Sequence, residues 1–161
     1  MNVNVIKEFR GDYSFLSNFY RADFSWRHIT FPTAEHAFVY IKSMYCYSSI
    51  PSKEILGNYL DAPPTEIKGH GRKLPINVAE WDKHKVGHMR EIIHAKFSDV
   101  DGLAGKLINT GAAMLVEGNT WGDNFWGRCY DEDGRMVGLN ILGVILMEER
   151  GYWLWGNEPP F

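Results

Sequence analysis

The chain is organised around one stretch, Glu117-Gly118-Asn119-Thr120-Trp121-Gly122-Asp123-Asn124-Phe125-Trp126-Gly127. This stretch holds two tryptophans, one phenylalanine and two carboxylates among three glycines. Because no strand-like or helix-like hydrophobic period runs through it, it predicts a loop. Glycine lets the backbone approach a ligand closely, and indole rings offer flat apolar faces. The loop therefore either folds back onto the core or forms the wall of a binding site, and both interpretations stay open.

The segments that flank this tryptophan loop (residues 117–127) predict how it is held. Residues 112–116 are mostly apolar and predict a buried strand that ends at Glu117. Residues 141–150 predict a final apolar helix, with Asn140 placed to be its N-cap. The loop is therefore expected to connect buried structure on both sides.

Length and composition bound the class of protein. The 161 residues fit one domain, and we expect a single domain over residues 1–161. Its aromatic tail, residues 151–161, is expected to pack back on the domain or to meet a partner, because large rings are poorly placed in water. The formal net charge of −3 argues against a general nucleic-acid binder held by phosphate contacts. Recognition of a single nucleotide stays possible.

The two cysteines, Cys46 and Cys129, show no CxxC spacing, which predicts neither a disulfide framework nor a cysteine-based zinc site. The first residues show no basic-then-apolar signal pattern, and no apolar run is long enough to span a bilayer. We therefore expect a soluble, cytoplasmic protein.

The first third of the chain predicts a strand, a hairpin and a helix. Residues 3–9 alternate weakly, like an edge strand, and residues 24–31 predict a hairpin that reverses near residues 25–27. Thr33 is placed to N-cap the helix that follows. The core face of that helix is expected to hold Ala34, Ala37, Phe38, Ile41 and Tyr45.

Two polar residues in this region are candidates for ligand binding. Ser17 and Asn18 lie between Phe15 and Phe19, where they could hydrogen-bond a ligand that is flanked by rings. They could equally form a turn that satisfies its own backbone.

Glu35 lies in the first turn of the predicted helix, where the helix dipole favours an anionic side chain. Lys42 follows two turns later, about 10 Å along the axis. At that separation the two side chains are not expected to pair directly, although both could reach one extended substrate. Simple complementarity to the dipole is the alternative explanation for Glu35.

The middle of the chain predicts further helices. Residues 52–60 are expected to form a short helix, and Thr65 is expected to cap the next one. Residues 78–97 are expected to form the longest helix, and Asp101 is expected to cap a short helix after it.

Two further groups of polar residues have alternative interpretations. Residues 68–73 are basic and glycine-rich but lack the P-loop frame, so they predict either a weak phosphate clamp through Arg72 and Lys73 or a solvated basic turn. His84 and His88 are spaced as zinc ligands can be, but no third ligand is evident, so two histidines on a solvated face explain the spacing better.

Six motifs run in order across almost the whole chain. They are F-L-S-N-F (Phe15 to Phe19), P-T-A-E-H with a lysine seven residues beyond its glutamate (Glu35, Lys42), A-K-F (Ala95 to Phe97), L-V-E (Leu115 to Glu117), D-N-F-W-G (Asp123 to Gly127) and G-L-N-I-L-G-x-x-L-M-x-x-R (Gly138 to Arg150). In this set the chain resembles the NADAR family, also called the YbiA-like family of N-glycosidases. Any one motif is weak, whereas the ordered set is specific.

The resemblance implies an α+β fold, a mostly helical single domain with a small β-sheet, and cleavage of N-glycosidic bonds. Bacterial relatives act on phosphorylated ribosylaminopyrimidine intermediates of riboflavin synthesis, and others remove ADP-ribose from guanine. Carried over by motif, the catalytic acids are Glu35 and Asp123. The expected substrate-binding residues are Phe15, Ser17, Asn18, Phe19, Lys42, Arg72, Glu117, Trp121, Trp126 and Asn140. Neither a metal nor a cofactor is expected.

The chemistry gives these residue types distinct tasks. Breaking a ribosyl C–N bond builds positive charge on the sugar, and a carboxylate near the reacting carbon stabilises that charge and can take a proton from water. We expect Glu35 to do this, while Asp123 orients ribose hydroxyls or the water, or protonates the leaving base. Trp126, Phe19 and Trp121 are the candidate rings for stacking on the base. Lys42 and, more weakly, Arg72 are the candidates for a phosphate.

Two other classes of function remain open at this point. The domain could bind ADP-ribose or a nucleotide without cleaving it, or it could recruit a partner through its aromatic tail. As an enzyme, its partner would be a small nucleotide-like molecule, or ADP-ribosylated guanine that could lie within nucleic acid, and no membrane is expected. The sequence does not choose between these substrates.

Overall fold

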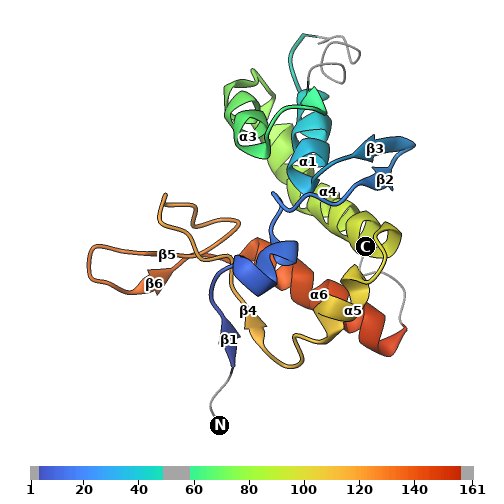
Figure 1. The fold of residues 1–161 in the computed structure, drawn as a ribbon. Helices are drawn as coiled ribbons and strands as arrows, with labels where there is room; N and C mark the ends of the chain where they lie inside the picture. The colour runs from blue at the N-terminus through green and yellow to red at the C-terminus, as the bar shows by residue number, and fades with distance from the viewer. Residues whose placement is uncertain (1–3, 49–58, 157–161) are drawn as a thin grey trace. The chain divides into compact units, whose positions relative to one another are not determined.

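The computed structural model describes residues 4–48 and 59–156, so the short helix predicted at residues 52–60 lies almost entirely outside the described residues. The described chain forms two compact units (Figure 1). Unit 1 comprises residues 4–17 and 101–156, and unit 2 comprises residues 18–48 and 59–100. Each unit is built from helices with short two-stranded pairings, which confirms the predicted α+β, mostly helical fold.

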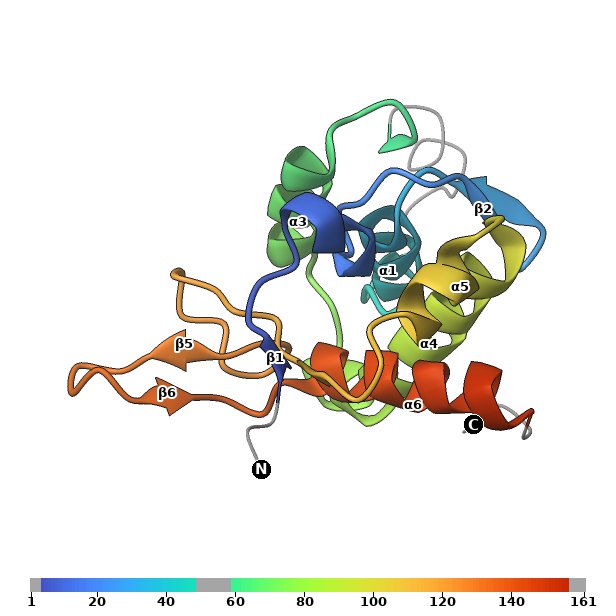
Figure 2. The ribbon, with the colours of Figure 1, turned by 60° about the horizontal axis from the view of Figure 1, so that its bottom comes forward.

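Unit 1 combines the N-terminal segment with the C-terminal third of the chain. Its elements are β1 (Val5–Ile6), the 3₁₀ helix η1 (Gly11–Leu16), α5 (Leu103–Ile108), β4 (Met114–Leu115), β5 (Cys129–Tyr130), β6 (Met136–Val137) and α6 (Ile141–Trp155). The strand β1 pairs in parallel with β4, and β5 pairs with β6 as an antiparallel hairpin. Figures 1 and 2 show this hairpin extending from the rest of unit 1 as an arm.

The last helix of unit 1, α6, packs against α5 and β4. Leu142, Ile145 and Leu146 on α6 are buried, as the apolar run predicted. The predicted end at residue 150 is wrong, because the helix continues to Trp155 and stops at Gly156 in a left-handed conformation with φ 64°. A single glycine at position 151 costs a helix only about 1 kcal/mol, which does not end it.

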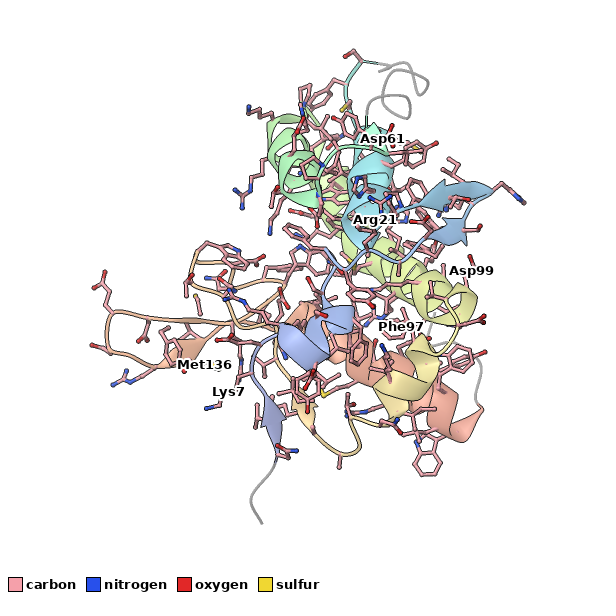
Figure 3. The ribbon with its side chains drawn as sticks, in the orientation of Figure 1. Lys7, Arg21, Asp61, Phe97, Asp99 and Met136 are labelled. Carbon is pink, nitrogen blue, oxygen red and sulfur yellow. The ribbon has the colours of Figure 1, made fainter. Side chains whose placement is uncertain are left out.

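The described residues of unit 2 form three helices and one hairpin. Its elements are β2 (Phe24–Trp26), β3 (Ile29–Phe31), α1 (Ala34–Ser43), α3 (Pro64–Lys73) and α4 (Val78–Asp99). The helix α1 packs against both α3 and α4. The hairpin is also tied to α4, since the backbone N–H of Ser25 donates to Asp99 at 2.7 Å (Figure 3 labels Asp99).

The predicted hairpin of unit 2 is confirmed, but its turn lies later than expected. Residues 24–26 belong to β2, and the reversal falls on Arg27 and His28, which both have positive φ (51° and 65°). Paired positive φ angles match the twist of a two-residue hairpin turn, although non-glycine residues adopt them rarely. Arg27 is held there by an ion pair with Glu91 at 2.9 Å.

The prediction for the start of α3 is wrong. The helix begins at Pro64 with Pro63 in the N-cap position and no side-chain capping bond, so Thr65 does not cap it. Proline suits the first helical position because its fixed φ is already helical and its missing N–H would have no partner there. Residues 68–73 continue this helix and are therefore not a basic turn.

The remaining helices follow their sequence signals with one exception. Asn77 caps α4 by accepting the N–H of Glu80 at 3.2 Å, and α4 runs to Asp99. For α5 the predicted cap is wrong, because Gly102 in a left-handed conformation holds the N-cap position instead of Asp101. None of the helices in the described parts of the chain has the length and apolar character needed to cross a membrane.

Candidate functional site

The start of α1 fixes the position of Glu35. As predicted, Thr33 is the N-cap, and its Oγ1 accepts the N–H of His36 at 3.3 Å. The ring of His36 lies between Thr33 Oγ1 at 2.7 Å and the Ala62 carbonyl at 3.1 Å. Because a carbonyl can only accept, Nε2 carries the proton and Nδ1 accepts from the threonine hydroxyl. Burial lowers the pKa of His36, which favours this neutral form.

Glu35 lies two residues after this cap and is buried, with 7% of its surface exposed. Its backbone N–H donates to the Asn18 carbonyl at 3.0 Å, so Asn18 of the F-L-S-N-F motif is joined to the first turn of α1. The side chain of Asn18 donates to Met89 Sδ at 3.7 Å. Its Oδ1 is buried and accepts no hydrogen bond from the residues that the structure describes. An unsatisfied buried acceptor is costly, and a ligand donor would satisfy it.

Lys42 lies on the same helix and links it to α3. Its Nζ donates to the Gly71 carbonyl at 2.7 Å. Burial lowers the pKa of Lys42, and the nearby charge of Glu35 partly offsets this. Glu35 and Lys42 therefore interact electrostatically. Arg72, the residue after Gly71, is exposed on α3.

The tryptophan loop of unit 1 is closed by a residue that the sequence analysis did not single out. Asn119 is 6% exposed. Its Oδ1 accepts the N–H of Asp123 at 2.9 Å, and its Nδ2 donates to the carbonyls of Asp123 at 2.7 Å and Arg128 at 3.1 Å. One amide thus holds both ends of the loop. The only signal of this role in the sequence is the position of Asn119, two residues after Glu117 in a glycine-rich segment.

Asp123 organises the turn that carries Trp126. Its Oδ1 accepts the backbone N–H groups of Phe125 at 3.2 Å and Trp126 at 2.9 Å. The ring of Trp126 is half-buried and meets Phe125 edge-on, with ring centroids 5.0 Å apart. Trp121 is 51% exposed. The carboxylate of Asp123 therefore has a clear structural task in the loop, whatever part it takes in chemistry.

Asn140 connects the start of α6 to Glu117. Its Oδ1 accepts the N–H of Glu117 at 3.0 Å, and its Nδ2 donates to the Leu115 carbonyl at 2.8 Å. Asn140 holds the N-cap position of α6, as predicted, but its side chain makes no capping hydrogen bond, because it serves the strand end instead of its own helix. Asn140 has φ 56°, a conformation that asparagine tolerates better than most residues. Gly143 leaves room for the same contact, since a Cβ there would overlap the Leu115 carbonyl.

The other predicted binding residues lie at the C-terminal end of η1 or shortly after it. Phe15 is buried at 4% exposure, with the Lys106 ammonium 5.9 Å from its ring. Ser17 follows η1, and its N–H donates to the Ser14 carbonyl at 3.0 Å. Phe19 belongs to unit 2, where the Lys68 ammonium lies 5.5 Å from its ring.

The predicted site residues thus form two groups. Unit 2 holds Glu35, Asn18, Phe19, Lys42 and Arg72, and unit 1 holds Phe15, Ser17, Glu117, Trp121, Asp123, Trp126 and Asn140. Within unit 2, hydrogen bonds join Glu35 to Asn18 and Lys42 to Gly71, next to Arg72. Within unit 1, the Asn119 amide accepts the N–H of Asp123 inside the tryptophan loop, and the Asn140 amide accepts the N–H of Glu117, where the loop begins.

The two histidines of α4, His84 and His88, differ in exposure and in contacts. Among residues 4–48 and 59–156, no three His, Cys, Asp or Glu side chains are grouped to hold a metal ion. His84 is exposed, whereas His88 is half-buried, which corrects the expectation of two solvated histidines. His88 stacks on Trp81 and lies 2.8 Å from the Tyr45 hydroxyl, and burial lowers its pKa.

Lys96, in the A-K-F motif, is a buried cation that the sequence analysis left without a role. It is fully buried on α4, and its Nζ lies 5.5 Å from the ring centroids of both Tyr20 and Phe97. Burial lowers the pKa of Lys96 to about 7. The two aromatic faces stabilise the ammonium form in part.

Comparisons with known proteins agree with this arrangement of motifs. The NADAR domain model matches residues 6–152. N-glycosidase YbiA of Escherichia coli is 31% identical over 140 residues, covering 86% of this chain and 81% of the relative. N-glycosidase R617 of Acanthamoeba polyphaga mimivirus is 32% identical over 93 residues, covering 53% of this chain and 54% of the relative. The NMR structure of E. coli YbiA superposes with a TM-score of 0.73 at 29% identity, covering 96% of this chain and 87% of that one. The chain belongs to the NADAR domain family.

Proposed function

We propose that this protein hydrolyses the N-glycosidic bond between a base and a ribose that carries phosphate, as phosphoribose or as ADP-ribose. The reaction class, hydrolysis of an N-glycosyl bond, follows from membership in a family whose matched relatives are N-glycosidases. The candidate substrates are ADP-ribosylated guanine, free or within nucleic acid, and ribosylaminopyrimidine phosphates. Both present a ribosyl C–N bond and at least one phosphate.

The observation that carries the proposal is the buried carboxylate of Glu35. A buried acid is costly unless its surroundings favour the charge. Here the helix dipole at the start of α1 and the nearby Lys42 ammonium both favour it. A water-poor setting strengthens the attraction of this carboxylate for a positively charged sugar.

In the proposed mechanism, the bond to the base lengthens and positive charge develops on the ribose ring, as in glycoside hydrolysis. Glu35 stabilises that charge and accepts a proton from the water that attacks C1′. The base leaves with the electron pair of the broken bond and takes up a proton. Asn18 offers its buried Oδ1 to a ribose hydroxyl, and Lys42 and Arg72 meet the phosphate.

Asp123 is our proposed second acid. One substitution separates its part in the reaction from its hydrogen bonds inside the tryptophan loop. Asp123→Asn keeps an Oδ1 that can accept the N–H groups of Phe125 and Trp126 but removes the charge. If the charge takes part in the reaction, this variant keeps the stability of the wild type and loses activity. Unchanged activity would leave Asp123 with its role in the loop only.

A substrate panel tests the proposed function. The protein is incubated with an ADP-ribosylated guanine nucleotide, NAD and ribosylaminopyrimidine phosphates, and the released base is measured by chromatography. Release from one member above the spontaneous rate identifies the substrate. Tight binding of these molecules with no base released from any of them would instead favour a binding module and refute the enzyme.

A further inference from the structure

We propose that Lys68 and Arg72 on α3, with the ring of Phe19 against Lys68, form the anion subsite that receives the substrate's phosphate. Arg72 is already a candidate for the phosphate from the sequence, whereas neither the motifs nor the matched relatives assign Lys68 a role. The identity of the ligand rests on the proposed function, whereas the subsite itself rests on the geometry of unit 2.

Helix geometry places the two cations together. Lys68 and Arg72 are four residues apart on α3 and so lie on the same face. The acid of this helix is on another face, where Glu66 lies 3.5 Å from His70 in an i,i+4 pair. Lys73 lies about 140° around the helix from Lys68. The face with Lys68 and Arg72 therefore carries positive charge that Glu66 does not neutralise.

The position of this face is fixed by close packing of α3 on α1. Ile67 is fully buried, and a Cβ at Gly71 would lie 2.7 Å from Val39 Cγ2. The ammonium of Lys42 donates to the carbonyl of Gly71, which lies between Lys68 and Arg72 in the sequence of α3. The helix is thus held against α1 on one side, and the cationic face is oriented by that contact.

A chain of contacts connects this face to Glu35. The Lys68 ammonium lies 5.5 Å from the Phe19 ring centroid, within the range of a cation–π interaction. Phe19 follows Asn18, whose carbonyl accepts the N–H of Glu35 and whose Oδ1 is buried without a protein donor among the described residues. The contacts therefore run in order from the Glu35 carboxylate to the unsatisfied acceptor of Asn18, then to the Phe19 ring and finally to the Lys68 ammonium.

That order matches the chemistry of a ribose phosphate. In such a molecule the glycosidic carbon, the ribose hydroxyls and the 5′-phosphate follow one another. The hydroxyls are hydrogen-bond donors that suit Asn18 Oδ1, and the phosphate is an anion that suits Lys68 and Arg72. With Glu35 at the glycosidic carbon, the phosphate falls on α3.

Direct binding tests this subsite without relying on catalysis. Ribose 5-phosphate and ribose are titrated into labelled protein, and affinities are measured from NMR chemical-shift changes for the wild type and for Lys68→Gln, Arg72→Gln and Lys73→Gln. The last variant is the matched control, because it removes one charge from the same helix on a different face. The spectra also report whether each variant keeps its fold.

We expect Lys68→Gln and Arg72→Gln each to weaken ribose 5-phosphate binding about tenfold, which corresponds to about 1.4 kcal/mol for one charge-assisted contact. Lys73→Gln should change it less than about twofold, and ribose binding should be unchanged in all variants. An equal effect of Lys73→Gln, or wild-type binding no tighter for the phosphate than for ribose, would overturn the subsite. The substrate panel reads base release instead, so either proposal can fail while the other stands.

Discussion

Replacing Gly71 with alanine tests how closely α3 lies on α1. The new Cβ would lie 2.7 Å from Val39 Cγ2 and 3.3 Å from Val39 Cγ1. Val39 is 2% exposed, and a β-branched side chain in a helix has one strongly preferred rotamer, so it cannot swing away cheaply. Either the two helices separate or Val39 leaves its rotamer. Overpacking of this kind costs about 1–3 kcal/mol.

An opposing effect has to be subtracted, because alanine favours a helix interior over glycine by about 1 kcal/mol. Gly69 measures that effect alone, since it lies in the same helix and a Cβ there meets nothing within 4 Å. We expect Gly69→Ala to stabilise the protein by about 1 kcal/mol and Gly71→Ala to destabilise it by about 0–2 kcal/mol. The difference between the two variants isolates the contact with Val39.

The assay is urea unfolding of both variants, with the free energy of unfolding taken from the midpoint at constant slope. In a Val39→Ala background the crowding is removed, so Gly71→Ala should there become as favourable as Gly69→Ala. The reasoning is refuted if Gly71→Ala stabilises the wild-type protein as much as Gly69→Ala does.

Two further perturbations have defined outcomes. Asn119→Ala removes the side chain that makes three hydrogen bonds across the tryptophan loop. In urea titrations this change should lower the free energy of unfolding by about 2 kcal/mol. A decrease below about 0.5 kcal/mol would mean that the loop closes without this side chain. Burial lowers the pKa of His36 and His88 below the ordinary value of 6.5, so below that pH the unfolded chain binds protons that the folded chain does not. Stability should therefore be fully present above about pH 6.5 and fall as the pH drops through the lowered values, and His88→Gln should flatten this slope; an equal slope in that variant would contradict the assignment.

Local signals in the sequence predicted much of the fold. The Thr33 cap, the hairpin and the long helix α4 depend on interactions between residues close in sequence, and the structure confirms each of them. The apolar run before Glu117 also ends in a strand, β4, although it is only two residues long. Propensity and periodicity suffice where neighbours along the chain decide the outcome.

Long-range contacts account for two features that the sequence did not predict. Asn140 is a residue type typical of N-caps and holds that position, but its side-chain amide hydrogen-bonds Glu117 and Leu115, more than twenty residues earlier in the chain. Gly71 looked like part of a solvated turn, yet it lies in a helix at the contact with Val39. No local pattern encodes a partner on another element, so these roles became visible only in the structure.

The sequence named candidate site residues but not how they are arranged. The motifs singled out Glu35 and Asn18, and the structure adds that one is buried and that the other has a buried acceptor atom. Asn119 and Lys68 were passed over, because a loop amide and a helix lysine are common residues with no distinctive spacing. Their importance comes from the groups that they contact.

The central claim is that the carboxylate of Glu35 takes part in breaking the glycosidic bond, and single-turnover base release by Glu35→Gln tests it most directly. Glu66→Gln is the matched control, because Glu66 also lies in the first turn of a helix but is exposed. With the substrate that the panel identifies, we predict that Glu35→Gln folds normally and releases base about 10²–10⁴ times more slowly, while Glu66→Gln matches the wild type. A folded Glu35→Gln variant with wild-type turnover would contradict the account.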